Sequence, residues 1–246
     1  MEGLCYPVCF DKQTSTFTMN NVYEEKYKNC LIKIIQDDSS QSPDDWGNED
    51  VFLVAYHRDI EVKRDNIITK DVAISISSKE YYGYEESCKD IEKRFYIFGL
   101  EAYIHSGISL SLSYEGSYPD RCWDVSQIGL VLVSKKEAKN RQKAKELALN
   151  LIKEWNDYLS GNVYGFTTED EDNGIDIDSC WGFYGDYQKS GILNEAKDSI
   201  DNYIKTQLKE SKKKTIDNSK KNLGELLASS NETIRRHAIG ILKQLN

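Results

Sequence analysis

The sequence predicts an α+β fold in which a mostly antiparallel sheet packs against one long amphipathic helix, followed by a small helical C-terminal tail. Two observations support this class. Strand-like segments follow one another up to residue 133 without a long helix between them, which favours antiparallel pairing. The strongest helical pattern comes only afterwards, over residues 134–160, where apolar side chains recur every three or four positions.

The first half of the chain is expected to supply most of the sheet. Residues 1–30 are weakly patterned and compatible with two short edge strands, whereas the apolar runs CLIKIIQ (Cys30–Gln36) and VFLVAYH (Val51–His57) predict buried strands. The alternation DVAISIS over residues 71–77 predicts a half-buried strand. Residues 79–93 are acidic and rich in tyrosine, and we expect a loop that leads into a short helix.

Residues 96–133 read as strand, turn, strand, polar loop and third strand. Ser134 with Glu137 forms a capping-box pattern at the start of the predicted helix, and Gly161 follows its last apolar position. A hairpin is expected around EDEDNG, where Asn173 and Gly174 would supply the positive-φ pair of a tight turn. Calcium binding by this acidic turn is the alternative, but its spacing does not match an EF-hand loop.

The chain is expected to divide into an α+β domain over residues 1–187 and a helical tail over 188–246. In the tail we expect a helix over residues 192–208, a charged linker near 210–222, and two short helices from residue 223 on. The last part carries an apolar stripe of Ile234, Ala238, Ile241 and Leu245.

Composition excludes several classes of protein. Of the 246 residues, 39 % are hydrophobic and 30 % are charged, and no apolar run approaches the roughly 20 residues that span a membrane. We expect no secretory signal, a cytoplasmic location and no membrane association. The net charge of −9 argues against direct nucleic-acid binding, which depends on phosphate neutralisation. The six cysteines are expected to be free thiols.

The polar loop of residues 96–133 holds the candidate catalytic residues His105, Cys122 and Asp124. A Cys–His–Asp arrangement is one way to activate a thiolate nucleophile. If the strands that end at His57 and His105 are neighbours, both imidazoles would reach the same rim of the sheet. The alternatives are structural roles in turns and core, or a metal bound by His57, His105 and Asp124; we predict no metal and no cofactor.

Aromatic side chains suggest a second kind of site. Trp123 and Trp181, together with His57 and Gln127, are candidate ligand-binding residues for a nucleotide or another planar molecule. Core packing is the alternative explanation for these tryptophans, and Trp155 is assigned to the core because it lies on the apolar face of the long helix. No GxGxxG pattern follows a strand, so a Rossmann or P-loop site is not supported.

Four segments together resemble a family of bacteriophage and mobile-element proteins without an assigned activity. They are SPDDWGNEDVFLVAYHRD from Ser42, YIHSGISLS from Tyr103, CWDVSQIGLVLVS from Cys122, and YLSGNVYGF with SCWGFYG from Tyr158 and Ser179. The resemblance covers about residues 30–187 and is carried by the order and spacing of these boxes. The chain departs from the family at Ile104, where an acid is usual, and at Val125, where serine is common.

The resemblance implies an accessory protein of a phage or mobile element that acts in the cytoplasm of the host cell. We expect a non-enzymatic binder or inhibitor of a host or defence component, of the anti-CRISPR or another anti-defence type. A small hydrolase or transferase that uses the Cys–His–Asp site is one alternative, and a protein that sequesters a nucleotide-type ligand is another. The sequence therefore leaves open whether the chain is an enzyme.

Overall fold

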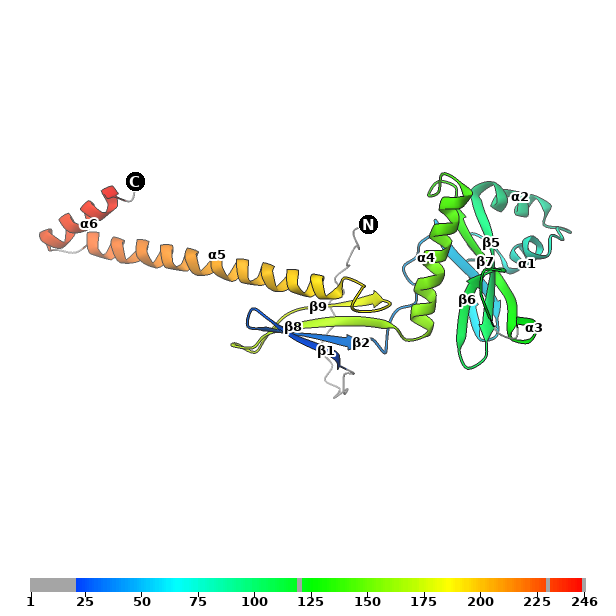
Figure 1. Ribbon diagram of the computed structural model, residues 1–246. Helices are drawn as coiled ribbons and strands as arrows, with labels where there is room; N and C mark the ends of the chain where they lie inside the picture. The colour runs from blue at the N-terminus through cyan, green and yellow to red at the C-terminus, as the bar shows by residue number, and fades with distance from the viewer. Residues whose placement is uncertain (1–20, 119–120, 229–230, 245–246) are drawn as a thin grey trace. The chain divides into compact units, whose positions relative to one another are not determined.

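The computed structural model describes residues 21–118, 121–228 and 231–244, with the side chains of the last helix described as far as Gly240. It confirms the α+β class, with two antiparallel sheets and helices packed on them (Figure 1). The sheet is thus divided in two, where the sequence predicts one.

The larger sheet has five strands in the order β4-β3-β7-β5-β6. These strands are β3 (Val51–His57), β4 (Ile60–Val62), β5 (Phe95–Ile104), β6 (Ile108–Leu112) and β7 (Val125–Ser134). β7 is central and pairs antiparallel with β3 on one side and β5 on the other. The predicted strand pattern of residues 96–133 is confirmed, with the short helix α3 (Arg121–Asp124) in its polar loop.

Both faces of this sheet carry an apolar core. On one face, α4 (Arg141–Leu159) packs Ala144, Ala148 and Trp155 against alternate strand residues such as Leu100 and Val131. On the other face, α1 (Lys70–Ser78) and α2 (Glu85–Arg94) cover a second cluster that contains Phe52, Val54, Leu130 and Leu132 (Figure 1). Because β7 is covered on both faces, residues 128–134 are buried without interruption.

The prediction of a strand over residues 71–77 is wrong, because this segment lies within α1. Its apolar residues also fit a helix, in which Val72 and Ala73 point into the core while Ile74 stays half exposed. Lys79 ends the helix in the left-handed conformation, with its N–H bonded to the Ser75 carbonyl.

The long amphipathic helix is confirmed, but it begins later than the capping box suggests. Ser134 is the last residue of β7, and α4 starts at Arg141. The Asn140 side chain caps the helix by accepting a hydrogen bond from the Lys143 backbone N–H at 2.8 Å. Asparagine is as good a cap as serine, so the sequence contained two candidate starts.

The smaller sheet has the order β1-β2-β8-β9. Its strands are β1 (Asn21–Tyr27), β2 (Cys30–Gln36), β8 (Val163–Asp170) and β9 (Ile175–Tyr184), so the predicted hairpin is confirmed. Its turn differs from the expected one, because Gly174 has a positive φ and Asn173 does not. Asn173 instead donates to the Asp170 carboxylate at 2.9 Å, and this bond lowers the pKa of Asp170. The positive-φ pair occurs in the other hairpin, at Lys28 and Asn29.

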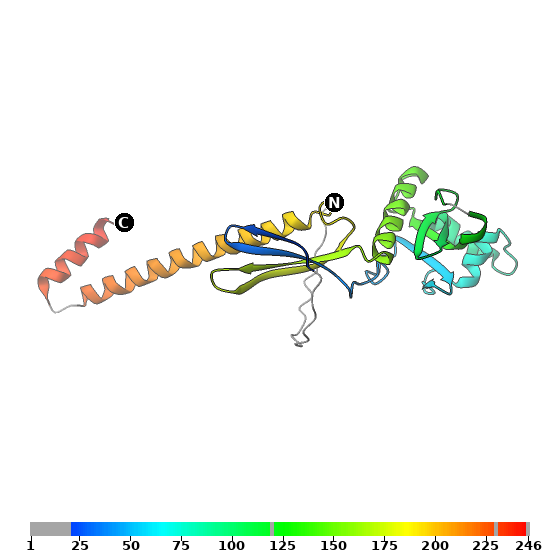
Figure 2. The ribbon, with the colours of Figure 1, turned by 60° about the horizontal axis from the view of Figure 1, so that its bottom comes forward.

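The tail differs most from its prediction. α5 (Ile192–Leu227) is one continuous helix of 36 residues, so the linker predicted near 210–222 is wrong (Figure 2). That segment lacks proline and is rich in lysine, a good helix former, so nothing in it interrupts a helix. In place of the expected pair of short helices, the chain has the C-terminal end of α5 followed by one separate helix, α6 (Glu232–Gln244).

The chain divides into two compact units. The first contains Lys33–Thr167 and Ser179–Leu193 together with the described residues before Glu25, and the second contains Glu25–Ile32, Thr168–Asp178 and the residues from Asn194 on. Each unit holds part of all four strands of the smaller sheet. The two units therefore divide at several points of the chain, whereas the sequence predicts a single boundary at residue 187. None of the helices in the described ranges has the length and apolar character that crossing a membrane requires.

The packing of α4 generates a stability prediction. Trp155 is 4 % exposed and belongs to the α4-side core, so Trp155→Ala should lower the free energy of unfolding by about 3–5 kcal/mol. Chemical denaturation of both proteins measures this loss. Leu149→Ala on the same helix is the control, because Leu149 is 40 % exposed and should cost far less. Equal losses in the two variants would contradict the described packing of α4.

Candidate functional site

The candidate site lies on the polar end of one sheet face. Leu100 and Ala102 point into the core under α4, so the alternating residues Glu101 and Tyr103 point to the opposite face. Glu101 is paired in register with Ser111 on β6 and with Gln127 on β7. This part of the face is therefore polar, in contrast to the apolar part under α1 and α2.

A bulge in β7 adjusts the register at this point. Leu100 pairs with Gly129 and Glu101 pairs with Gln127, so Ile128 has no partner on β5. The extra residue allows Ile128 to be buried in the α4-side core while Gln127 stays beside Glu101. Gly129 is required here, because a Cβ at this position would lie 1.9 Å from the Val54 carbonyl oxygen.

A buried carboxylate organises the connection between β6 and β7. Glu101 is 6 % exposed, and its Oε2 atom accepts hydrogen bonds from Arg121 Nη2 and from the Tyr114 backbone N–H. Arg121 also donates through Nη1 to the Gly116 carbonyl at 3.2 Å, and its guanidinium lies 5.3 Å from the centre of the Tyr114 ring. One arginine thus neutralises the buried charge and fixes the connection at two points.

Stacked rings hold the same connection to β5. The Tyr103 and Tyr118 rings are nearly parallel, with centroids 5.0 Å apart, and the Tyr118 hydroxyl donates to the Ser109 carbonyl at 3.4 Å. A Cβ on Gly116 would lie 2.2 Å from the Tyr118 ring, so the close approach depends on glycine. The Ser111 and Ser113 hydroxyls are buried here without a hydrogen-bond partner.

Two of the three predicted catalytic residues are brought together. His105, which follows β5, places Nδ1 3.3 Å from Asp124 Oδ2 at the end of α3. The His105 ring also stacks on Tyr103 with centroids 6.2 Å apart, and its side chain is 67 % exposed. The carboxylate and the imidazole lie within ion-pair distance, and they are the two group types of a general-base pair.

Cys122 is exposed on α3, next to this pair in sequence. Among the described residues, it forms no hydrogen bond with His105 or with Asp124. The predicted thiolate site is therefore present as a histidine–aspartate pair with a nearby exposed thiol. Attack by Cys122 stays a prediction.

His57 is not placed beside His105. Both residues lie where strands finish at the same end of the sheet, but β7 separates β3 from β5, so the condition that these two strands are neighbours is not met. His57 Nδ1 lies 3.5 Å from Asp59 Oδ2 instead. It lines a separate cavity of about 270 Å³ with Tyr56, Arg58, Glu61 and Lys70.

The remaining predicted ligand-binding residues are dispersed. Gln127 stays on the polar sheet face, where its amide nitrogen lies near Gly99. Trp123 is 87 % exposed on α3, whereas Trp181 lies on β9 and covers Gly165 of β8. The two tryptophans thus belong to different elements, and no described ring contact joins them. In the described parts of the chain, no group of three or more His, Cys, Asp or Glu side chains is arranged to hold a metal.

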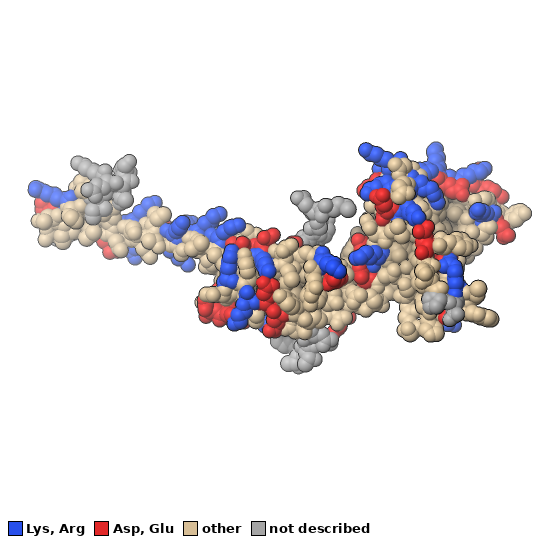
Figure 3. Space-filling model, in the orientation of Figure 1, with Lys and Arg blue, Asp and Glu red and all other residues tan. Residues whose placement is uncertain are grey.

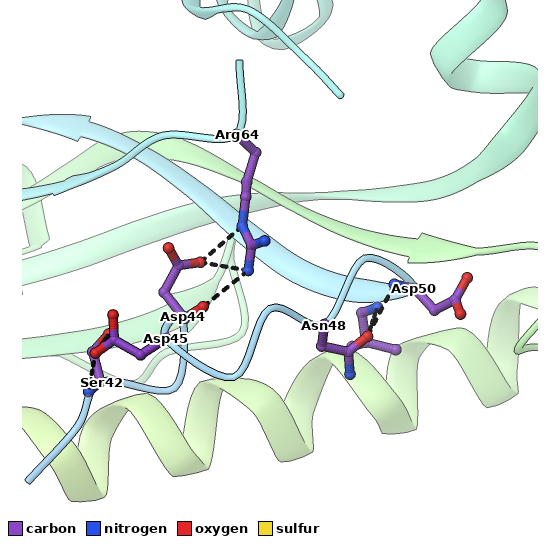
Figure 4. Close-up of polar contacts among 7 residues, drawn as sticks. Ser42, Asp44, Asp45, Asn48, Asp50 and Arg64 are labelled. Carbon is purple, nitrogen blue, oxygen red and sulfur yellow. Dashed lines mark hydrogen bonds and ion pairs between the residues drawn. The ribbon is translucent and has the colours of Figure 1, made fainter. Parts of the chain in front are cut away.

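The SPDDWGNED segment, which carries part of the family resemblance, is a hydrogen-bonded loop (Figure 4). Arg64 donates from Nε to Asp44 Oδ1 at 2.9 Å and from Nη2 to the Asp44 carbonyl at 3.3 Å. The Ser42 backbone N–H donates to Asp45, and Asn48 accepts from the backbone N–H of Asp50 just before β3. The carboxylates of Asp44 and Asp45 therefore shape the loop, which is a structural role for these two residues.

Sequence reasoning missed Glu101, Arg121 and Arg64. An acid within the apolar run FGLEAYI was the available signal for Glu101, because a buried carboxylate needs a cationic partner. The sequence around Arg121 and Arg64 contains no comparable signal that these residues pair with a carboxylate.

Comparisons with known proteins add no assignment. No protein-family model, no curated protein and no solved structure matches this chain.

The buried ion pair generates a second stability prediction. Arg121→Gln should lower the free energy of unfolding by about 2–4 kcal/mol, because Glu101 would remain buried without its cationic partner. Lys145→Gln removes a more exposed ion pair with Glu115 and should cost at most about 1 kcal/mol. Thermal or chemical denaturation distinguishes the two. A silent Arg121→Gln would show that the pair does not hold the connection.

Cysteine labelling tests the positions of the thiols. Burial raises the pKa of both Cys30 and Cys88, so little thiolate forms there near pH 8 and little reagent reaches it. Iodoacetamide should therefore modify the exposed Cys122 well before Cys30 and Cys88 in the folded protein, as measured by peptide mass spectrometry. The difference should disappear in denaturant. Comparable labelling of Cys88 and Cys122 without denaturant would contradict the described burial.

Proposed function

We propose that this chain is a non-enzymatic binding protein that engages a protein partner through the surface formed by Tyr114, Trp123 and His105. In line with the family resemblance, the partner is a host or defence component, and the chain serves a phage or mobile element as an accessory protein. The observation that carries the proposal is the 87 % exposure of Trp123 on a connection held by a buried ion pair. Tryptophan and tyrosine are enriched among the residues that dominate binding energy at protein interfaces.

The surrounding residues support the same use. Tyr114 is 88 % exposed and has a φ of 66°, a left-handed conformation that glycine adopts with less steric cost. This conformation adds strain and does not stabilise the fold. A large exposed ring held in it therefore supports a role in contacting a partner. Glu101 and Arg121 fix the backbone at this point, so little conformational entropy would be lost on binding.

The His105–Asp124 pair favours the hydrolase alternative, in which Cys122 supplies the nucleophile. The absence of a described bond from the Cys122 thiol to His105 makes this the second candidate. The two functions predict opposite effects for neighbouring residues, which permits a direct test.

The proposal is tested by phage or plasmid establishment in a defended host that expresses each variant. Trp123→Ala should reduce the effect of the chain by at least about tenfold, because an interface anchor is worth about 2 kcal/mol or more. Tyr82→Ala is the matched control, since Tyr82 is equally exposed, at 88 %, but precedes α2. Cys122→Ser should retain the effect. Loss of the effect in Cys122→Ser with a silent Trp123→Ala would contradict binding and support catalysis.

A further inference from the structure

The exposed part of α5 is basic, in contrast to the net charge of the whole chain. Residues 205–221 contain seven lysines and two acidic residues, whereas the whole chain has a net charge of −9. Every residue in this range is exposed. Figure 3 shows basic side chains along this part of the helix. This helical segment is therefore strongly basic, although the protein as a whole is acidic.

Five of these lysines share one side of the helix. With about 100° between successive residues, they fall within an arc of about 100° that extends over about 22 Å of helix. Glu210 and Asp217 lie outside this arc, and so do Lys214 and Lys221. We call the five residues the lysine stripe: Lys205, Lys209, Lys212, Lys213 and Lys220.

The lysine stripe is available to an external anion. Within the described chain, Lys209, Lys212, Lys213 and Lys220 take part in no ion pair. At physiological ionic strength, the acidic remainder of the chain does not cancel the positive field of the stripe, because salt screens exposed charges beyond about 8–10 Å. The net charge of the whole chain therefore does not determine which ligands this helix attracts.

We propose that the lysine stripe binds the phosphate backbone of nucleic acid without reading base sequence. A straight row of cations on a rigid helix is complementary to a regular row of phosphates. The range 205–221 contains no aromatic residue and no arginine, so it lacks the side chains that most often stack on bases or recognise guanine. Leu208 and Ile216 are its only exposed large apolar side chains, too few for insertion into a lipid surface.

This proposal revises the expectation that direct nucleic-acid contact is absent, which rested on the net charge of the whole chain. It is independent of the proposed Trp123 surface, because it concerns a different element. Binding to a protein partner and binding to a phosphate backbone can therefore be tested separately.

The test measures binding of the full chain to fluorescently labelled random-sequence DNA duplexes by anisotropy over a range of salt concentrations. If all five lysines contact phosphates, the logarithm of the association constant should fall with the logarithm of salt concentration with a slope of about −4.5. The double variant Lys209→Gln/Lys212→Gln should reduce the steepness of this slope by about 2 and weaken binding at least about tenfold at low salt.

The matched control is Lys214→Gln/Lys221→Gln, which removes the same charge from the same helix outside the arc. This control should bind DNA nearly as the unmodified chain does, and circular dichroism should show equal helix content in all three proteins. Equal weakening in both double variants would overturn the proposal, since only overall charge would then matter. Failure of the unmodified chain to bind DNA at low salt would also overturn it, and binding to anionic vesicles instead would assign the stripe to lipid headgroups.

Discussion

The buried carboxylate of Glu101 organises the polar end of the five-stranded sheet. A charge in the middle of β5 must be neutralised, and the neutralising group, Arg121, lies on the connection between β6 and β7. That requirement brings the connection across the sheet face, where Tyr118 stacks on Tyr103. Trp123 is then presented outward, and Asp124 is placed beside His105.

The two ends of this sheet face serve different purposes. Under α1 and α2 the face is apolar and contributes to the core through Phe52, Val54 and Leu130. Beyond Gly99 it becomes polar, and the β6–β7 connection covers it with hydrogen bonds and aromatic contacts. A stable core next to a polar, aromatic surface is an arrangement that suits recognition, because the scaffold keeps the exposed residues in place.

The sequence was sufficient to predict the elements that depend on local periodicity. Apolar runs identified β2, β3 and the central strands, and three- to four-residue spacing identified α4. It was insufficient where two local patterns compete, as in residues 71–77, whose apolar positions fit both a strand and a helix. Of the candidate site, the sequence indicated the His105–Asp124 pair, but Glu101 and Arg121 are twenty residues apart and meet only through the tertiary fold.

A double-mutant cycle measures whether the Glu101–Arg121 pair holds the β6–β7 connection in place. The free energy of unfolding would be measured for the unmodified chain, Glu101→Gln, Arg121→Gln and the double variant. A direct interaction predicts a coupling energy of about 1–3 kcal/mol, with the double variant less destabilised than the sum of the single changes. Additivity within about 0.5 kcal/mol would show that the pair does not hold the connection, because two residues that do not interact contribute independently.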